Sequence, residues 1–118
     1  MKILIVEDDL IGVDMYDLCV GLGHQAELAS WLERAEELLA EDKFDMIFLD
    51  HNLPVKKGGA VKPTGYGLRV SVETVVVGTS SSSDNEVELA GCNPPAKKMK
   101  KENLWQDIPM ILSQIDGS

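Results

Sequence analysis

Three short apolar runs stand out along the chain. They span Ile3 to Val6, Met46 to Leu49 and Val75 to Val77. Each run is continuous rather than alternating, which is typical of strands that are covered on both faces of a parallel sheet. We therefore expect these runs to form three inner strands.

A helix is expected directly after the first run. Apolar residues recur there at helical spacing, and Asp9 precedes them in a position that suits a helix cap. Gly21 and Gly23 supply the stop. The recurring residues are Ile11, Met15, Leu18 and Leu22.

A strand and a second helix are expected before the second run. Gln25 to Ala29 predicts a short strand, and Ser30-Trp31-Leu32-Glu33 has the pattern of a capping box. The buried stripe of this helix would hold Trp31, Ala35 and Leu38. Strands and helices alternating at these spacings indicate a doubly wound α/β sheet.

The second half of the chain is less regular. Val55 to Gly67 holds five glycine and proline residues and predicts a loop, so only Tyr66 to Val72 remains for a third helix. A short helical stretch is expected near Asp84 to Ala90. The apolar pattern from Leu104 to Ile115 predicts an amphipathic helix, which Pro109 should kink or split.

Length and composition favour a cytoplasmic globular protein. Residues 1–118 suffice for one domain with a single core. No apolar run approaches the roughly 20 residues of a membrane span, and acidic residues follow the start too soon for a secretory signal. Cys19 and Cys92 match no metal or redox spacing. We expect no membrane partner.

The charge balance is acidic, with 20 Asp and Glu against 11 Lys and Arg and a formal net charge of -9. Phosphate backbones repel such a surface, so direct binding of nucleic acid is not expected. The one basic cluster is short and lacks interleaved aromatic residues. It comprises Lys97, Lys98, Lys100 and Lys101.

Acidic residues follow the predicted strands. Glu7 and Asp8 come after the first run and Asp50 after the second, so adjacent parallel strands would bring these carboxylates to one edge of the sheet. Two carboxylates about 4 Å apart repel by about 4 kcal/mol at an effective dielectric near 20. Such a cluster is stable when it holds a cation, and hard oxygen ligands suit Mg²⁺.

In order and spacing, these features resemble the receiver domain of the two-component response-regulator family. The resemblance rests on Ile-Leu-Ile-Val-Glu-Asp-Asp at the start, Asp50-His51-Asn52-Leu53-Pro54 after the second run and Thr79 after the third. Ala90-Gly91-Cys92, with a lysine shortly after, extends it. The resemblance covers nearly the whole chain and implies a five-stranded parallel sheet of order 2-1-3-4-5, with helices on both faces, in the flavodoxin-like manner.

The resemblance also implies roles for individual residues. Asp50 matches the aspartate that accepts the phosphoryl group. Asp8 would bind Mg²⁺ directly, Glu7 would act through a metal-bound water, and Asn52 would offer its backbone carbonyl to the metal. Thr79 and Lys98 would contact the phosphoryl group, although the neighbouring lysines compete with Lys98 for that role.

The chain departs from the family pattern in three ways, one of which is an extended loop after Pro54 followed by a shortened helix. Proline usually follows the lysine, but Met99 follows Lys98. An aromatic residue is common three positions before the lysine, where this chain has Pro95. These departures concern the route by which a receiver signals to its target.

By resemblance, the chain would be phosphorylated by a histidine kinase or a phosphotransfer protein in a phosphorelay and would then switch its binding to a downstream protein, with a homodimer also open. It would not be an enzyme with a separate substrate, since it would catalyse only phosphorylation and dephosphorylation of its own aspartate. One alternative is a pseudo-receiver that binds partners without phosphorylation. A second, ranked lower, is an Mg²⁺-dependent hydrolase with an aspartyl-phosphate intermediate, because Asn52 stands where such chemistry commonly needs a second carboxylic acid.

Overall fold

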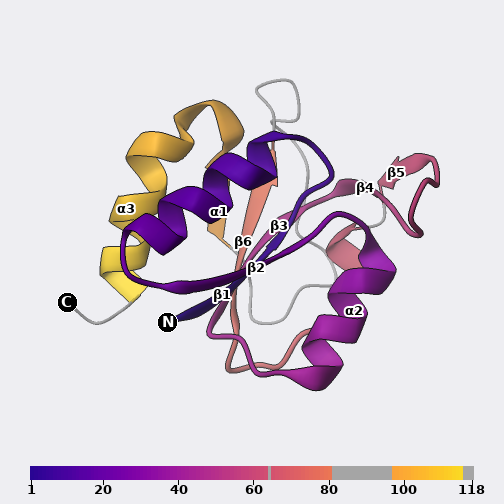
Figure 1. The fold of residues 1–118 in the computed structure, drawn as a ribbon, viewed down its shortest axis with the longest axis horizontal. Coiled ribbons are helices and arrows are strands. Elements are labelled where there is room, and N and C mark those ends of the chain that lie inside the picture. Colours follow the sequence, from indigo (N-terminus) through magenta and orange to yellow (C-terminus); the bar gives the residue numbers. More distant parts are fainter. Residues whose placement is uncertain (64, 81–96, 116–118) are drawn as a thin grey trace.

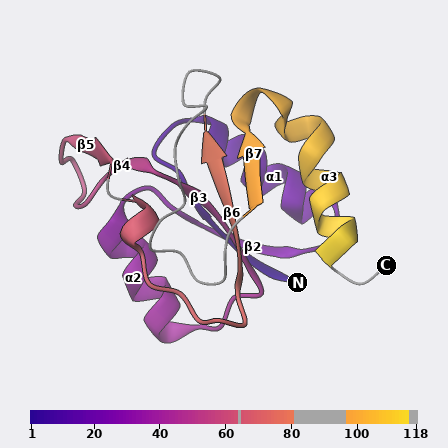
Figure 2. The same ribbon diagram turned by 180° about the vertical axis from the view of Figure 1, so that it is seen from behind.

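The computed structural model describes residues 1–63, 65–80 and 97–115. Five parallel strands form its central sheet in the order β2-β1-β3-β6-β7, which confirms the predicted order (Figures 1 and 2). The strands are β1 (Lys2–Val6), β2 (Gln25–Ala29), β3 (Met46–Asp50), β6 (Val75–Ser80) and β7 (Lys97–Lys100).

The three continuous apolar runs form the inner strands β1, β3 and β6. All five residues of β3 are buried, as are four of the five in β1. The edge strand β2 instead alternates between exposed and more buried positions, because Ala26 and Leu28 pack on one face of the sheet while only Ala29, at the end of the strand, is buried on the other. Its weaker sequence signal follows from this edge position.

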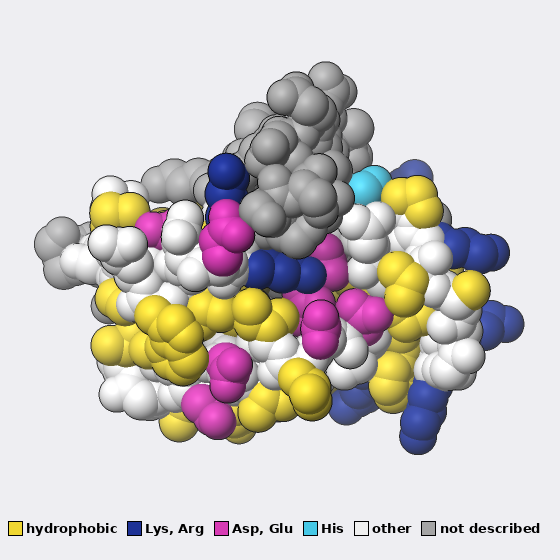
Figure 3. Space-filling view, turned by 90° about the horizontal axis from the view of Figure 1, so that it is seen from above, with side chains coloured by type: hydrophobic (Ala, Val, Ile, Leu, Met, Phe, Trp, Pro, Cys, Tyr) yellow, Lys and Arg dark blue, Asp and Glu magenta, His cyan; other side chains and the backbone are white. Residues whose placement is uncertain are grey.

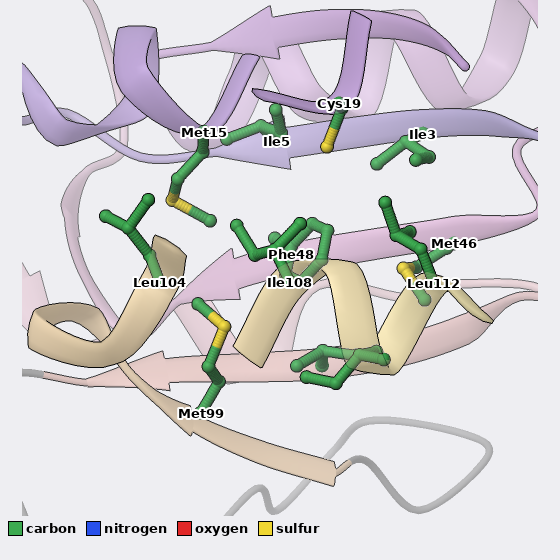
Figure 4. Packing of buried hydrophobic residues seen from close by; sticks show 12 residues of the cluster. Ile3, Ile5, Met15, Cys19, Met46, Phe48, Met99, Leu104, Ile108 and Leu112 are labelled. Atoms are coloured by element: carbon green, nitrogen blue, oxygen red, sulfur yellow. The ribbon is translucent and has the colours of Figure 1, made fainter. Parts of the chain in front are cut away.

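Helices cover both faces of the sheet, as predicted. Helices α1 (Ile11–Gly21) and α3 (Leu104–Ile115) lie on one face, and α2 (Leu32–Glu41) lies on the other (Figure 1). Figure 4 shows Met15 and Cys19 of α1 and Ile108 of α3 packed with strand residues such as Phe48. Successive strand residues face opposite sides, so Leu4, Ile47 and Leu49 pack with Ala35 and Leu38 of α2 instead.

The helix boundaries differ in detail from the sequence interpretation. In α1 the buried stripe uses Met15 and Cys19, while Leu22 lies beyond the helix and is 43% exposed. The expected capping box of α2 is absent, since Trp31 is the N-cap and makes no side-chain cap hydrogen bond. The backbone N–H of Glu33 instead donates to the carbonyl of Val55 at 2.9 Å, so a neighbouring segment serves this end of the helix.

The expected loop between β3 and β6 contains an antiparallel hairpin. Its strands are β4 (Asn52–Pro54) and β5 (Val61–Pro63). The helix expected over Tyr66 to Val72 is not formed, and only the short 3₁₀ turn η1 (Gly65–Gly67) is found there. Gly67 and the β-branched Val70 and Val72 lower the helical propensity of this segment, which explains the difference.

Helix α3 runs from Leu104 to Ile115 without interruption, so Pro109 does not split it. The N–H that Pro109 lacks would have bonded the carbonyl of Trp105, a residue on the exposed side of the helix where water can serve that carbonyl. A short 3₁₀ turn, η2 (Lys101–Asn103), precedes α3. The expected helix at Asp84 to Ala90 lies outside the described residues.

No helix in the described part of the chain is both long enough and apolar enough to cross a membrane.

Candidate functional site

Polar residues meet at the carboxyl edge of the sheet. Glu7 and Asp8 follow β1, Asp50 ends the adjacent β3, and Thr79 lies in β6 as the register partner of Asp50. The interiors of these strands are apolar, so the polar side chains that could bind a ligand lie where the strands end. In the view of this edge in Figure 3, acidic side chains gather around a basic one near the centre.

The three acidic residues that were predicted from the sequence to meet at one edge of the sheet lie close together in the structure. Glu7, Asp8 and Asp50 each offer one ligand oxygen, and these oxygens lie within 4.8 Å of one another. Glu7 is 1% exposed and Asp50 is 3% exposed, whereas Asp8 is exposed. The cluster therefore has a buried floor and one carboxylate facing solvent.

A lysine already compensates the two buried carboxylates. The Lys101 ammonium lies 2.8 Å from Glu7 Oε2 and 3.0 Å from Asp50 Oδ2. The sequence favoured Lys98 for this place. Lys98 lies in β7 opposite Gly78, and its side chain is outside the described part of the structure. The lysine that the structure brings to Asp50 is thus Lys101, at the first residue after β7.

Burial shapes the titration of this group. Burial and the nearby charge of Asp50 raise the pKa of Glu7 to about 8, against the lowering effect of Lys101. Burial likewise raises the pKa of Asp50, again opposed by Lys101. For Lys101, burial acts to lower the pKa, but the hydrogen bonds and charges of the two carboxylates outweigh it and the pKa is raised. At pH 7 without a metal, Glu7 is therefore largely neutral.

Thr79 and Asn52 also lie beside Asp50. The Thr79 side chain is 1% exposed, and its hydroxyl oxygen has no hydrogen-bond partner among the described residues. A buried hydroxyl without a hydrogen-bond partner is energetically unfavourable. An anion bound at this edge of the sheet would accept a hydrogen bond from it. The backbone N–H of Asn52 donates to Asp50 Oδ1 at 3.3 Å, which orients the carboxylate.

Two glycines that the sequence interpretation did not single out position the acidic residues. A Cβ on Gly65 would lie 2.1 Å from the carbonyl oxygen of Asp50 and 2.9 Å from the Cα of His51, and the Gly65 N–H donates to the His51 carbonyl at 2.8 Å. A Cβ on Gly12 would lie 3.2 Å from the Glu7 side chain. The glycine-rich composition of the loop was the only signal for Gly65, and nothing in the sequence marked its contact with Asp50.

The oxygen cluster fits a magnesium ion. Oxygen ligands on opposite sides of Mg²⁺ lie about 4 Å apart, which is close to the spread of the three carboxylate oxygens. All three donors are hard oxygens, and the exposed Asp8 leaves room for the waters that Mg²⁺ retains. The Lys101 contact with Glu7 also suits the expectation that Glu7 acts through a metal-bound water rather than directly.

The positions at which the chain departs from the receiver-domain pattern are counted from the lysine beside Asp50, so they shift when that lysine is Lys101 rather than Lys98. Glu102 follows Lys101 where the family usually has proline, and the residue three positions before Lys101 is Lys98 rather than an aromatic. Met99 is 2% exposed and packs in the core with α1 and α3 (Figure 4). Pro95, on which the sequence interpretation placed this departure, lies outside the described residues, as does Cys92.

Solved receiver domains share this fold over nearly the whole chain. A response regulator receiver domain (CheY-like) from Methylobacillus flagellatus matches with a TM-score of 0.72 and 22% identity, covering 98% of each chain. The receiver domain of a sensor histidine kinase from Pseudomonas aeruginosa, whose structure has a magnesium ion in the active-site cleft, matches with a TM-score of 0.73 and 18% identity. That match covers 99% of this chain and 98% of the other. A two-component response regulator from Clostridium difficile matches with a TM-score of 0.71 and 21% identity over 99% of each chain.

These identities establish likeness of fold. The chain has the receiver-domain fold, as the order of its motifs predicted. No protein-family model matches the chain, and no curated protein is similar to it in sequence.

Proposed function

We propose that this chain is a phospho-accepting receiver domain of a two-component system, with Asp50 as the acceptor. The observation that supports this most strongly is the pairing of a buried Asp50 with Lys101, inside a cluster of magnesium-type ligands at the carboxyl edge of a receiver fold. Lys101 contacts two of the three acidic residues, Glu7 and Asp50, and a metal ion held with Asp8 would neutralise the negative charge that remains when all three are ionised.

In this proposal Asp50 is the nucleophile. One of its carboxylate oxygens forms a bond to phosphorus as the bond between phosphorus and the donor's leaving atom breaks, and the leaving group takes the electron pair. Lys101 then neutralises charge on a phosphoryl oxygen, and the Thr79 hydroxyl donates to another. The amide contact from Asn52 holds the attacking carboxylate in place.

Asp8 and Asp50 would bind the magnesium ion directly, Glu7 would bind it through a water, and Asn52 would offer its backbone carbonyl. The bound ion would neutralise charge on the carboxylates and on the transferring phosphoryl oxygens. In keeping with the resemblance to receiver domains, the donor would be a histidine kinase or a phosphotransfer protein, and the target would be a protein whose binding changes with phosphorylation. The chain would turn over no separate substrate, because the phosphoryl group is transferred to its own Asp50.

A pseudo-receiver is the second candidate, and one observation favours it. Lys101 already contacts both buried carboxylates, and a neutral Glu7 lowers their repulsion, so the cluster is stable without metal or phosphate. In that case the fold would act as a binding module in one constant state. The two functions differ in whether the chain can be phosphorylated.

Phosphoryl transfer from a small phosphodonor is the direct test. The protein is incubated with acetyl phosphate, with Mg²⁺ or with EDTA, and its intact mass is measured. The proposal predicts a mass gain of one phosphoryl group in Mg²⁺ and none in EDTA. No gain under either condition, with an authentic receiver labelled in parallel, would favour the pseudo-receiver.

Magnesium should stabilise the folded chain through Asp8. At ten times the dissociation constant, a ligand that binds only the native state adds about 1.4 kcal/mol, which corresponds to a rise in Tm of roughly 6 °C for a domain of this size. Asp8→Asn removes the exposed ligand and should abolish the rise in thermal melts with millimolar Mg²⁺. The matched control Asp14→Asn, on α1 and outside the cluster, should respond like the wild type. An undiminished rise in Asp8→Asn would locate the metal elsewhere.

Replacing Lys101 separates the two candidate lysines. A hydrogen bond to a charged group contributes about 1.5–3 kcal/mol, so Lys101→Met should slow phosphorylation by acetyl phosphate roughly 10-fold to 100-fold. Lys98→Met should leave the rate within about twofold of the wild type. Rates are compared by time-resolved intact mass at saturating Mg²⁺. Loss of the rate in Lys98→Met with normal labelling of Lys101→Met would return the role to Lys98.

A further inference from the structure

The β4–β5 hairpin, residues 52–63, is a basic surface on an acidic protein. It carries three exposed lysines and no acidic residue, in a chain of net charge -9. The three hairpin lysines, Lys56, Lys57 and Lys62, form no ion pair with a described acidic side chain. Figure 3 shows basic side chains along the margin of the molecule on which Figure 1 draws β4 and β5.

The hairpin contacts the start of helix α2. The Val55 carbonyl accepts the N–H of Glu33 at the start of α2, and the ammonium of Lys57 lies 5.9 Å from the centre of the Trp31 ring. The turn between its strands contains Gly58 in the left-handed region, with φ of 76°. Contacts of this kind reduce the conformational entropy that the hairpin would lose when it binds a partner.

A hollow on the hairpin lies between two of its lysines. It has a volume of about 340 Å³ and is lined by Val55, Gly59 and Ala60 together with the two lysines Lys56 and Lys62. This volume is at the small end of ligand cavities, which span about 300–1,000 Å³. The exposed Val61 adds apolar surface beside it. The hairpin therefore combines a small apolar recess with positive charges on its rim.

We infer that this hairpin binds an acidic segment of a partner protein, with an apolar side chain of that segment in the hollow and its carboxylates on the lysines. A long polyanion such as a nucleic acid, or an anionic membrane, would face the repulsion of the whole -9 surface. A short acidic segment carries its charge locally and avoids most of that repulsion. The inference goes beyond the proposed function, because it requires no phosphoryl group on Asp50.

The probe is a fluorescein-labelled peptide of four glutamates and two leucines, and its binding to the unphosphorylated chain is followed by fluorescence anisotropy at low salt. One variant carries Lys56→Gln, Lys57→Gln and Lys62→Gln. The matched control removes the same three positive charges elsewhere, through Arg34→Gln, Lys43→Gln and Lys100→Gln. All six side chains lie on the surface, and the ion pairs of Arg34 and Lys43 are exposed, so both variants should fold.

The hairpin variant should bind the peptide at least about 10-fold more weakly than the wild type, whereas the control should stay within about twofold. A peptide with serines in place of the leucines should bind the wild-type protein more weakly than the original peptide does. Equal affinity of the two variants, or no binding by the wild type, would overturn the inference. Binding of a single-stranded oligonucleotide or of phosphatidylserine vesicles as tightly as the peptide, with the same dependence on the lysines, would also overturn it.

Discussion

Replacing Gly65 with alanine is expected to destabilise the fold by about 3 kcal/mol. The added Cβ would lie 2.1 Å from the Asp50 carbonyl oxygen and 2.9 Å from two atoms of His51. All three atoms belong to the backbone, so no flexible side chain can move aside, and the chain around Asp50 must shift. Urea unfolding followed by circular dichroism measures the loss as a lower midpoint at an unchanged m-value.

Gly67 provides the matched control, since it lies in the same 3₁₀ turn and a Cβ there would meet no atom within 4 Å. Gly67→Ala should change stability by no more than about 0.5 kcal/mol. The Gly65→Ala variant should also be phosphorylated more slowly, because the displaced backbone is that of Asp50. Equal stabilities of the two variants would show that this segment does not fix the backbone at Asp50.

The second large effect is a dependence of stability on pH that comes from Glu7. Its pKa is raised from 4.5 to about 8 in the folded chain, mainly by burial. Between pH 4.5 and pH 8 the Glu7 carboxyl has lost its proton in the unfolded chain but keeps it in the folded chain. Stability therefore falls as the pH rises from about 4.5 to 8, with a slope on the order of 1 kcal/mol per pH unit for this one proton, and levels off above pH 8. The raised pKa of Asp50 acts in the same direction.

Glu7→Gln keeps the shape of the neutral acid and cannot lose a proton. In metal-free buffer it should match the wild type at pH 4.5 and exceed it by a few kcal/mol at pH 8. The measurement is urea unfolding at both pH values. Glu36→Gln, which changes an exposed side chain on α2, should retain the wild-type dependence. A wild-type stability that rises from pH 4.5 to 8, or a Glu7→Gln variant with the same slope as the wild type, would contradict the burial argument.

The sheet was predictable because its inner strands are apolar on both faces. The middle of a parallel sheet covers both faces of a strand, which suits the continuous apolar runs Ile3 to Val6, Met46 to Leu49 and Val75 to Val77. Parallel strands end at a common edge, so the meeting of Glu7, Asp8 and Asp50 also followed from the sequence. These features depend on local pattern and topology, both of which a single sequence carries.

Features that depend on a boundary or a distant contact were not predictable. Four lysines lie within five residues, and which one reaches Asp50 depends on β7 ending at Lys100. The hairpin has strands of only three residues, formed around glycine and proline, so its composition looks like a loop. The start of α2 was misjudged for a similar reason, because the Val55 carbonyl takes the N–H of Glu33 from a segment far along the chain.

The central claim is that Asp50 accepts a phosphoryl group, and locating that group on the chain tests it most directly. Wild type and Asp50→Asn are treated in parallel with acetyl phosphate and Mg²⁺, and their intact masses and proteolytic peptides are compared. We predict one phosphoryl group on wild type, in a peptide that contains Asp50, and none on Asp50→Asn, with both proteins equally folded. A phosphoryl group that persists on Asp50→Asn would contradict the account.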